Sequence, residues 1–439
     1  MKNTVRFVNS IHHIGAETWQ QLLNSDNPFL RFEFLAALED GQCIDSPYQT
    51  IPLNSGWIPN YAILEGHNAD SQDAQILAIA PVFQKLHSYG EYVFDWGWAE
   101  AYERHGLKYY PKLVWAIPFT PSTGPRIISQ GHSAQQVHYH QQIAQGLTEY
   151  SQHNHFSGWH CLFPDATSNE ALVQLANPSH FNNQNHLNNS PDQSPFSHKT
   201  MARTSCQFHW FNNRFTDFSH YLEKFTSRKR KNINKERSRL LESGFVFNKK
   251  VGNQITPADI ENFYHCYQLT YAKRKMRGYL TLDFFQKILQ TMPDQLLLVQ
   301  AQYPATHQTS NHNSIVANAL YFKDADNLYG RYWGCLEEFD SLHFECCYYQ
   351  GIEYCIEHNI SHFDPGTQGE HKISRGFEPT ICHSQHWIAH PQFSQAIDDF
   401  LKEEQQDIQA YAIQAAEHLP FNQSALSPQP NKAADKTSQ

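Results

Sequence analysis

The sequence predicts an α+β protein of two domains, with mixed, mostly antiparallel sheets and a basic helical segment between them. Three observations support this prediction. The chain has 439 residues, which is enough for two or three domains with a large core. Both halves interleave stretches of helical periodicity with short apolar strands, in an order that favours antiparallel pairing. A polar stretch at residues 176–200 separates the halves, and a strongly basic stretch follows it.

The first half, residues 1–175, is expected to form one domain. Gly41 ends the second of two opening helices, and Gly106 stops a short helix that begins at Trp98. Mostly apolar runs bounded by turn residues mark the strands. The expected helices are 16–25, 27–41, 98–105 and 133–154, and the expected strands are 74–86, 92–96, 112–119 and 158–164.

Two segments are expected to lack regular structure. Residues 176–200 are rich in Asn, Ser, His and Pro and have no apolar period, so they are interpreted as a flexible insertion. The tail, residues 418–439, has the same character and is expected to be disordered.

The second half is expected to contain a connecting strand and basic helical arm (201–255) and then a second domain (256–417). Thr256 suits an N-cap and Pro257 the first helical turn. Ser227 can cap the basic helix, and Gly244 stands where a C′ glycine belongs. The expected helices are 216–225, 226–244, 256–275, 281–292 and 344–359, and the expected strands are 295–302, 314–322, 327–334 and 361–366.

The composition argues against several classes of protein. A formal net charge of −10 disfavours a protein that coats nucleic acid. The first residues lack the apolar run of a signal peptide, and no window resembles a membrane span. The nine cysteines form no CxxC pair, which favours reduced thiols in a cytoplasmic protein. No second half of a metal motif accompanies the "CHSQH" cluster at 382–386, so no metal is expected.

The basic helical arm carries a one-sided charge. "SRKRKNINKERSRL", residues 227–240, has seven Lys or Arg and a single acidic residue. At helical pitch, four of these cations share one stripe suited to a row of phosphates. The stripe consists of Arg228, Lys231, Lys235 and Arg239. It predicts an anionic partner, such as tRNA, a diphosphate-linked precursor or a lipid headgroup; the alternative is a solvated helix face. The "AKRKMRG" stretch at 272–278 is a second basic segment.

A loop with an unusual set of side chains follows the last expected strand. In "FDPGTQGEHKISRGFEP", residues 363–379, Asp364 ends the strand and the next two residues turn the chain. Acyl transfer to an amine needs a base, a cation for the oxyanion and a pocket for the donor. Glu370 or His371 suits the base, Lys372 the cation, and Arg375 a phosphate or carboxylate contact. The alternative is a turn that pins the last strand by local salt bridges.

A second candidate surface is the aromatic stretch at residues 87–113. Glu91, Tyr92 and Asp95 lie there among several tyrosines and tryptophans, a mixture that suits a cleft for a sugar, a peptide or an aromatic ring. An aromatic core with hydrogen-bonded carboxylates fits the same pattern. Cysteines at 346, 347 and 355 suit a buried helix face better than a nucleophile.

These segments resemble the FemAB-like proteins, a group associated with peptidoglycan biosynthesis or recognition within the GNAT superfamily of acyltransferases. The resemblance spans about residues 27–400 and rests on several stretches of the chain. They are 87–113, "PFTPSTGPR" (118–126, which ends in Arg126), 227–240, 330–358 and the loop at 363–379. It implies two tandem GNAT-like domains, the first a divergent copy of the second. The order helix, helix, strands, helix, strand in 256–366 is typical of such a domain.

The resemblance also implies a chemistry. The better-understood Fem enzymes move an amino acid from aminoacyl-tRNA to a peptidoglycan precursor, and a lysine similar to Lys372 lies near their transfer site. Arg126 joins Arg375 and the aromatic stretch as an expected substrate contact. One departure concerns the donor: the turn "GCLEEFDSLHFE" has four acidic residues instead of the glycine-rich loop that holds coenzyme A. The expectation is an acyltransferase acting on an amine, with aminoacyl-tRNA or acyl-CoA as possible donor; an acetyl-CoA N-acetyltransferase and a non-catalytic binding module are the alternatives.

Overall fold

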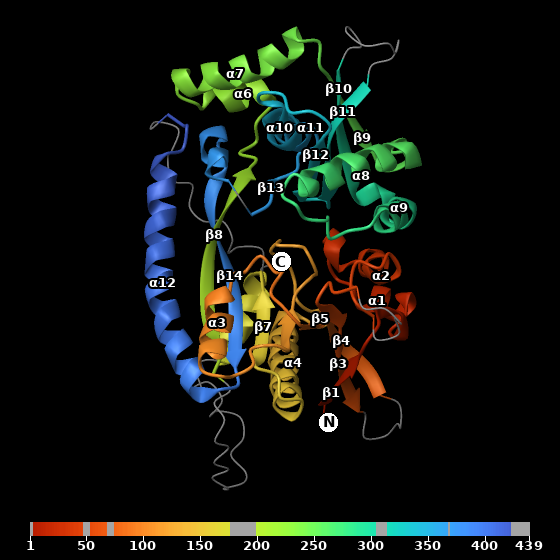
Figure 1. Ribbon diagram of the computed structural model, residues 1–439, viewed down its shortest axis with the longest axis vertical. Coiled ribbons are helices and arrows are strands. Elements are labelled where there is room, and N and C mark those ends of the chain that lie inside the picture. Colours follow the sequence, from red (N-terminus) through yellow and green to blue (C-terminus); the bar gives the residue numbers. More distant parts are fainter. Residues whose placement is uncertain are drawn as a thin grey trace.

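Fourteen strands and twelve helices make up the parts of the chain that the computed structural model describes, which are residues 3–46, 53–67, 74–175, 199–303, 314–367 and 369–422 (Figure 1). The strands are β1 (Asn3–Val8), β2 (Trp57–Pro59), β3 (Tyr61–His67), β4 (Ala74–Ala80), β5 (Val82–Lys85), β6 (Lys112–Trp115), β7 (Gly158–Leu162), β8 (Met201–Phe211), β9 (Val246–Val251), β10 (Leu296–Tyr303), β11 (Ser314–Lys323), β12 (Asn327–Cys335), β13 (His362–Asp364) and β14 (Glu378–Ile388). The helices are α1 (Ala16–Leu22), α2 (Phe32–Asp40), α3 (Trp96–Arg104), α4 (Ser133–His153), α5 (Ala166–Leu175), α6 (Phe218–Glu223), α7 (Ser227–Glu242), α8 (Pro257–Ala272), α9 (Leu282–Thr291), α10 (Leu342–Phe344), α11 (Gln350–Glu357) and α12 (Pro391–Glu417). A π-helical turn, η6 (Glu345–Tyr349), joins α10 to α11, and a 3₁₀ helix, η7 (Glu370–Arg375), follows β13.

One long sheet runs through both halves of the molecule. It contains eleven strands in the order β2-β5-β6-β7-β14-β8-β13-β12-β11-β10-β9, and β1-β3-β4 form a separate sheet. The pairs β6–β7 and β12–β13 are parallel, whereas the other pairs of the long sheet are antiparallel. The structure therefore confirms the expected α+β class with mixed, mostly antiparallel sheets.

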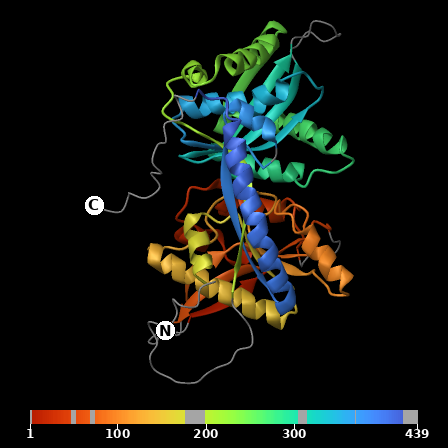
Figure 2. The same ribbon diagram turned by 90° about the vertical axis from the view of Figure 1, so that its left-hand side faces the viewer.

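Strands β8 and β14 connect the two halves. β14 lies near the end of the chain, yet it pairs with β7 of the first half and, over nine residue pairs, with β8. β8 in turn pairs with β13 of the second half. Figure 2 shows α12 running lengthwise along these strands. The division of the sequence at 176–200 therefore differs from the division of the sheet, because the first half is completed by residues from the C-terminal part.

The two halves also share a hydrophobic core. Phe34 of α2 packs against Phe284 of α9 with ring centroids 5.5 Å apart, and Phe29 packs against Phe322 of β11 at 5.1 Å. All four side chains are buried in one cluster that contains residues of both halves. Because burial of apolar area favours a single arrangement, this contact holds the halves at a set spacing and so positions the cavity between them.

Local signals explain the helices that the sequence predicts well. Thr256 caps α8 through a bond from the Asp259 N–H, and the Asp259 carboxylate accepts from the Thr256 N–H at 2.8 Å. Pro257 occupies the first turn as expected. Gly244 follows the C-cap of α7 with φ of +86°, which agrees with its assignment as a C′ glycine.

Several local predictions were wrong. The strand expected at 74–86 is divided into β4 and β5 at Pro81, which lacks an N–H for the ladder. Residues 92–95 form no strand, because Tyr92 has φ of +60°, and α3 begins at Trp96 instead of Trp98. The N-cap of α7 is Thr226, one residue before Ser227. Residues 176–198 of the expected insertion and 423–439 of the expected tail lie outside the described residues.

Candidate functional site

A cavity of about 620 Å³ lies between the two halves. Residues 88–96 of the first half form one wall, and the second half provides the rest from α8, β11, β12, η6 and the loop after β13. Its aromatic lining consists of Tyr89, Tyr92, Phe94, Trp96, Tyr267, Tyr271, Tyr279, Tyr321, Tyr332, Trp333 and Tyr348. Arg274 and Arg331 are the cations of this lining, which contains no Asp or Glu among the described residues. The cavity therefore suits an anionic ligand with apolar or ring-shaped faces.

The loop after β13 begins with a tightly held carboxylate. Asp364 is buried; its Oδ1 accepts from the Gly366 N–H at 2.8 Å, and its Oδ2 accepts from Arg331 and Ser122 at 2.7 Å each. Burial alone raises the pKa of Asp364, but Arg331, His209 and these hydrogen bonds outweigh it and hold the pKa well below its usual range. Gly366 has φ of +90°, a conformation open to glycine, so the chain turns there over the cavity.

Lys372 lies behind this turn. Its side chain is buried, and its Nζ donates to the carbonyl oxygen of Gly366, which lines the cavity. Burial lowers the pKa of Lys372 to about 8, although Asp364 raises it. An ammonium group this close to the cavity is available to an oxyanion if the Gly366 contact is exchanged for the ligand.

His371 lies on the wall of the same cavity. Its Nε2 and the Tyr348 hydroxyl are 2.8 Å apart. Burial, Arg375 and Lys372 lower the pKa of His371, which keeps the imidazole neutral at neutral pH and able to accept a proton. The π-helical turn η6 carries Tyr348 and Cys347 on this wall. Burial raises the pKa of the Cys347 thiol well above its usual value, which argues against a thiolate nucleophile.

Glu370 and Arg375, the expected base and anion contact, do not line the cavity. Glu370 is exposed and accepts a hydrogen bond of 2.8 Å from Tyr411 of α12, so it points away from the cavity. Arg375 is buried; it binds the Glu236 carboxylate at 2.9 Å and covers the ring of Phe344, 3.4 Å from the centroid. Since its guanidinium already has partners, Arg375 pins the loop to α7; this ion pair joins distant parts of the chain, whereas the structural alternative expected local ones.

Glu91 and Asp95 also have a structural environment. Both are buried around Lys112, whose Nζ contacts Asp95 and lies 2.8 Å from Glu91. Burial raises the pKa of Glu91 to about 7 against the effect of Lys112, and burial lowers the pKa of nearby Lys85 to about 7 despite Glu91. These charges support the wall beneath Ser88 and Gly90, whereas Tyr92 itself lines the cavity. Neither Glu91 nor Asp95 lines the cavity, so their contacts favour the alternative of an aromatic core with hydrogen-bonded carboxylates.

Arg126 is likewise a structural residue. Its side chain is buried and donates to the backbone carbonyl groups of Leu162, Gly124, Pro125 and Ser122 at 2.7 to 3.0 Å. A guanidinium that satisfies four carbonyl oxygens holds the turn in place and leaves little capacity for a ligand. These contacts favour a structural role for Arg126 over the expected substrate contact.

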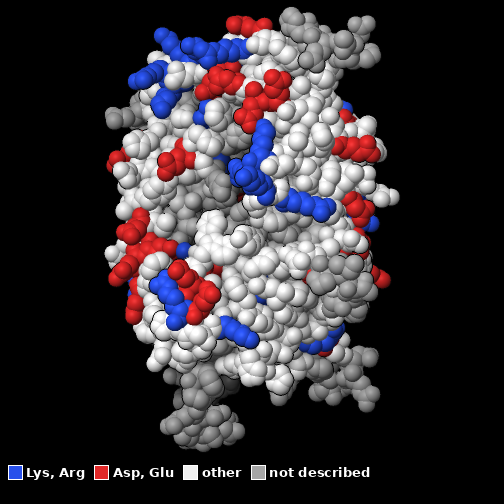
Figure 3. Space-filling view, viewed as in Figure 1, with Lys and Arg blue, Asp and Glu red and all other residues white. Residues whose placement is uncertain are grey.

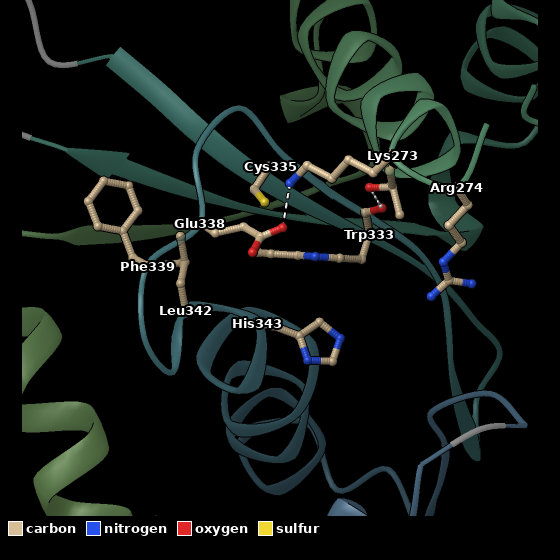
Figure 4. Close-up of a pocket in the computed structure, with 9 residues that line it drawn as sticks. Lys273, Arg274, Trp333, Cys335, Glu338, Phe339, Leu342 and His343 are labelled. Carbon is tan, nitrogen blue, oxygen red and sulfur yellow. Dashed lines mark hydrogen bonds and ion pairs between the residues drawn. The ribbon is translucent and has the colours of Figure 1, made fainter. Parts of the chain in front are cut away.

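A second cavity, of about 450 Å³, adjoins the first at the turn between β12 and α10 (Figure 4). The cavities share Thr270, Arg274, Trp333 and His343. Figure 4 shows Glu338 directed toward Lys273, and the ion pair measures 2.6 Å. Burial lowers the pKa of His343 to about 4, so this ring is neutral at neutral pH. The turn thus carries a carboxylate, which repels an anionic ligand at this place.

The basic residues of α7 lie on the surface. Arg228, Lys231 and Lys235 are exposed, and Arg239 is exposed beside Asp340 at 3.3 Å. In Figure 3, Lys and Arg side chains gather along α7 and again in the middle of the same face. The exposed cations at the end of α8 are Lys273, Arg274, Lys275 and Arg277. Both basic segments expected from the sequence are thus available to an anionic partner.

Sequence reasoning missed three contributors to the site. Arg331, Tyr348 and Trp333 line the cavity between the halves, but each belongs to a stretch that reads as ordinary strand or helix. An arginine inside the apolar strand "NLYGRYWG" was the available signal, because a buried arginine requires a partner. No cluster of three His, Cys, Asp or Glu suited to a metal ion occurs within the described ranges. In the same ranges, no helix is long and apolar enough to cross a membrane.

Comparison with known proteins gives one family match. A family model called FemAB-like, described as peptidoglycan biosynthesis/recognition, matches residues 10–423. No curated protein matches the chain.

Among solved structures, the chain is similar to FemX, with 9% identity, a TM-score of 0.46, and coverage of 91% of this chain and 100% of that one. It is also similar to L-PGS from Bacillus licheniformis, with 8% identity, a TM-score of 0.42, and coverage of 75% and 84%. A tandem GNAT protein from the clavulanic acid biosynthesis pathway has 7% identity, a TM-score of 0.39, and coverage of 89% and 99%.

Proposed function

The chain belongs to the FemAB-like family of peptidoglycan biosynthesis/recognition proteins, and from that premise we propose that it transfers an acyl or aminoacyl group to an amine on a peptidoglycan-related precursor. The reaction would take place in the cavity of about 620 Å³ between the two halves. The observation that carries the proposal is the turn at Gly366, which brings His371 onto the cavity wall with Lys372 directly behind it.

The chemistry follows from these side chains. The amine nitrogen attacks the carbonyl carbon of the activated donor, a C–N bond forms, and the bond to the leaving oxygen or sulfur breaks. The neutral imidazole of His371 takes the proton that the amine loses. The ammonium group of Lys372 stabilises the negative charge on the carbonyl oxygen of the tetrahedral intermediate. No covalent intermediate on the protein is required, in agreement with the raised pKa of Cys347.

Aminoacyl-tRNA is the donor that the surface favours. The exposed cations of α7 and of the end of α8 lie on one face of an otherwise acidic protein (Figure 3). Such clusters bind phosphate backbones through charge and not through base sequence. Acetyl-CoA is the second candidate, but Glu338 lies at the turn where its pyrophosphate would bind, and this carboxylate disfavours it. The reaction belongs in the cytoplasm under this proposal, where charged tRNA and reduced cysteines coexist.

Transfer of a labelled group tests the proposal. The purified full chain would be mixed with tRNA charged with ¹⁴C-labelled amino acids and a nucleotide-linked peptidoglycan precursor that has a free amine. A parallel reaction would contain labelled acetyl-CoA. We expect label to move from tRNA to the precursor and to remain on acetyl-CoA.

Two lysine variants test whether the transfer depends on Lys372. Lys372→Ala should abolish most of the transfer, while Lys402→Ala on the exposed face of α12 should leave it unchanged. Transfer from acetyl-CoA alone would reverse the choice of donor. A folded protein that transfers neither label, but retains a bound ligand in native mass spectrometry, would be a binding module and would refute an enzymatic role.

A further inference from the structure

Two histidines lie on the far side of Asp364 from the loop that carries His371 and Lys372. His209 of β8 and His362 of β13 are adjacent across the sheet, and both line a third cavity of about 400 Å³. Asp364 lines this cavity too, so the carboxylate lies between the histidine pair and the Gly366 turn. The proposed transfer reaction makes no use of these histidines.

Three short contacts connect the pair to its surroundings. The Nε2 atom of His209 lies 3.0 Å from Oε1 of Gln207. The Nδ1 atom of His209 lies 2.9 Å from Nε2 of His362. The Nδ1 atom of His362 lies 2.8 Å from Oδ1 of Asn327. Each of these distances is that of a hydrogen bond, so each contact needs one proton between its two atoms.

The two amide groups at the ends of this chain have defined orientations. The Gln207 side-chain nitrogen donates to the carbonyl oxygen of Pro121 at 3.2 Å. The Asn327 side-chain nitrogen donates to the Asp324 carboxylate at 2.9 Å. Turning either amide over would place its oxygen against another oxygen. Both amide oxygens therefore face the histidines, and an oxygen of this kind can only accept.

The number of protons that these contacts need exceeds the number that two neutral rings carry. Two neutral imidazoles carry two N–H groups in total, but three contacts require three. We propose that His209 and His362 share one extra proton, and that this buried positive charge faces Asp364 and keeps its carboxylate ionised. His209 Nε2 and Asp364 Oδ1 are 3.9 Å apart, which is close enough for a strong charge interaction. The pair consists of positioning residues that act on the loop through Asp364.

The charged groups around the pair determine how strongly it binds the extra proton. Asp364 and Asp324 favour it, whereas Arg331 and Lys372 near His209 oppose it. Burial lowers the pKa of His209 to about 3 and also lowers that of His362, so the three hydrogen bonds must outweigh a large cost of burying the charge. Loss of any one of these bonds should weaken the binding of this proton.

A second histidine pair in the same protein provides an internal contrast. Nδ1 of His160 and Nδ1 of His386 are 2.8 Å apart, in the core of the first half. Tyr109 donates its hydroxyl proton to Asp95 and can accept from His160 at 3.3 Å, while Ser384 can donate to His386 at 2.8 Å. Two N–H groups complete this chain. The same count therefore predicts a neutral pair here.

Nitrogen NMR on the full chain with ¹⁵N-labelled histidine distinguishes the two pairs, because protonated and unprotonated ring nitrogens have different shifts. Spectra recorded near pH 6.5, the ordinary pKa of histidine, should show three protonated nitrogens for His209 and His362 and two for His160 and His386. Single His→Gln variants would assign the signals. Two protonated nitrogens in the first pair would overturn the proposal.

Variants of Gln207 test whether its hydrogen bond to His209 holds the extra proton on the pair. Gln207→Met removes one acceptor at similar volume and should weaken proton binding by the pair by about tenfold or more, since a hydrogen bond to a charged group is lost. Gln207→Glu should strengthen it. Gln385→Met, at an equally buried glutamine of β14 that bonds Asn169, is the matched control and should have no effect. An unchanged proton affinity in Gln207→Met would refute the count; if that variant does not fold, the spectrum of the native chain decides.

Discussion

Replacing Asp364 by Asn should destabilise the protein strongly. The carboxylate is buried and lies 2.7 Å from the Arg331 guanidinium, which is also buried. Removing the negative charge leaves the arginine without its counter-ion in a low-dielectric environment. The same change places an amide N–H₂ either against the Gly366 N–H or against the donors of Arg331 and Ser122. Both effects lower the stability of the folded protein.

The magnitude follows from the burial of both partners. Breaking one side of a buried ion pair costs about 3–5 kcal/mol, which is a large part of the stability of an ordinary domain. Exposed pairs contribute far less, because water screens both charges. The Glu338–Lys273 pair is exposed on both sides, so Glu338→Gln is the matched control.

Equilibrium unfolding in urea would measure the effect in four proteins: the native chain, Asp364→Asn, Arg331→Met and the double variant. The double variant should be more stable than the sum of the single losses predicts, since it contains no unpaired buried charge. Fluorescence and circular dichroism should be compared, because a chain of this size can unfold in more than one step.

Two results would refute this account. If Asp364→Asn changed stability no more than Glu338→Gln does, the carboxylate would not be an essential partner. Additive losses in the double variant would show that Asp364 and Arg331 do not interact energetically.

Three further predictions concern the site and its supports. Lys372→Ala should reduce the transfer rate by on the order of 10² to 10³ without unfolding the protein, as for loss of one oxyanion donor. Lys372→Arg should restore little of the rate, because a planar guanidinium does not replace an ammonium. A rate of Lys372→Ala close to that of the native chain would exclude Lys372 as the group that stabilises the oxyanion. Changing the exposed stripe of α7 to Gln should weaken tRNA binding and flatten its salt dependence at unchanged thermal stability, and retention of the full salt slope in a filter-binding assay would identify the stripe as a solvated face. The pKa of Glu91 is raised to about 7 and that of Lys85 is lowered to about 7, so folding should take up a proton on Glu91 below pH 7 and release one from Lys85 above it. Stability should therefore fall as pH rises toward 7 and rise again beyond it. In urea unfolding measured across pH, Glu91→Gln should remove the fall in stability below pH 7, and Lys85→Met should remove the rise above it. A pH dependence unchanged by these substitutions would contradict the assignment.

Features that depend on neighbouring residues were determined by the sequence. The capping box of Thr256 and Asp259 set the start of α8, and the charge pattern of 227–240 marked α7 as a largely exposed basic helix. Asp364 followed by Gly366 predicted a turn, because the carboxylate accepts a hydrogen bond from the backbone N–H two residues later and glycine adopts the positive φ. The family resemblance is confirmed by the match over residues 10–423.

Only the tertiary structure decided which charged side chains reach the cavity. Glu91 and Asp95 have the composition of a binding site, but they enclose Lys112, which is 21 and 17 residues away along the chain. Glu370 and Lys372 are neighbours in sequence, yet one meets Tyr411 of α12 and the other lies behind Gly366. β14 returns from the second half to pair with β7 of the first. The partner of a buried charge or strand edge is set by elements that meet at long range, and no local pattern encodes that meeting.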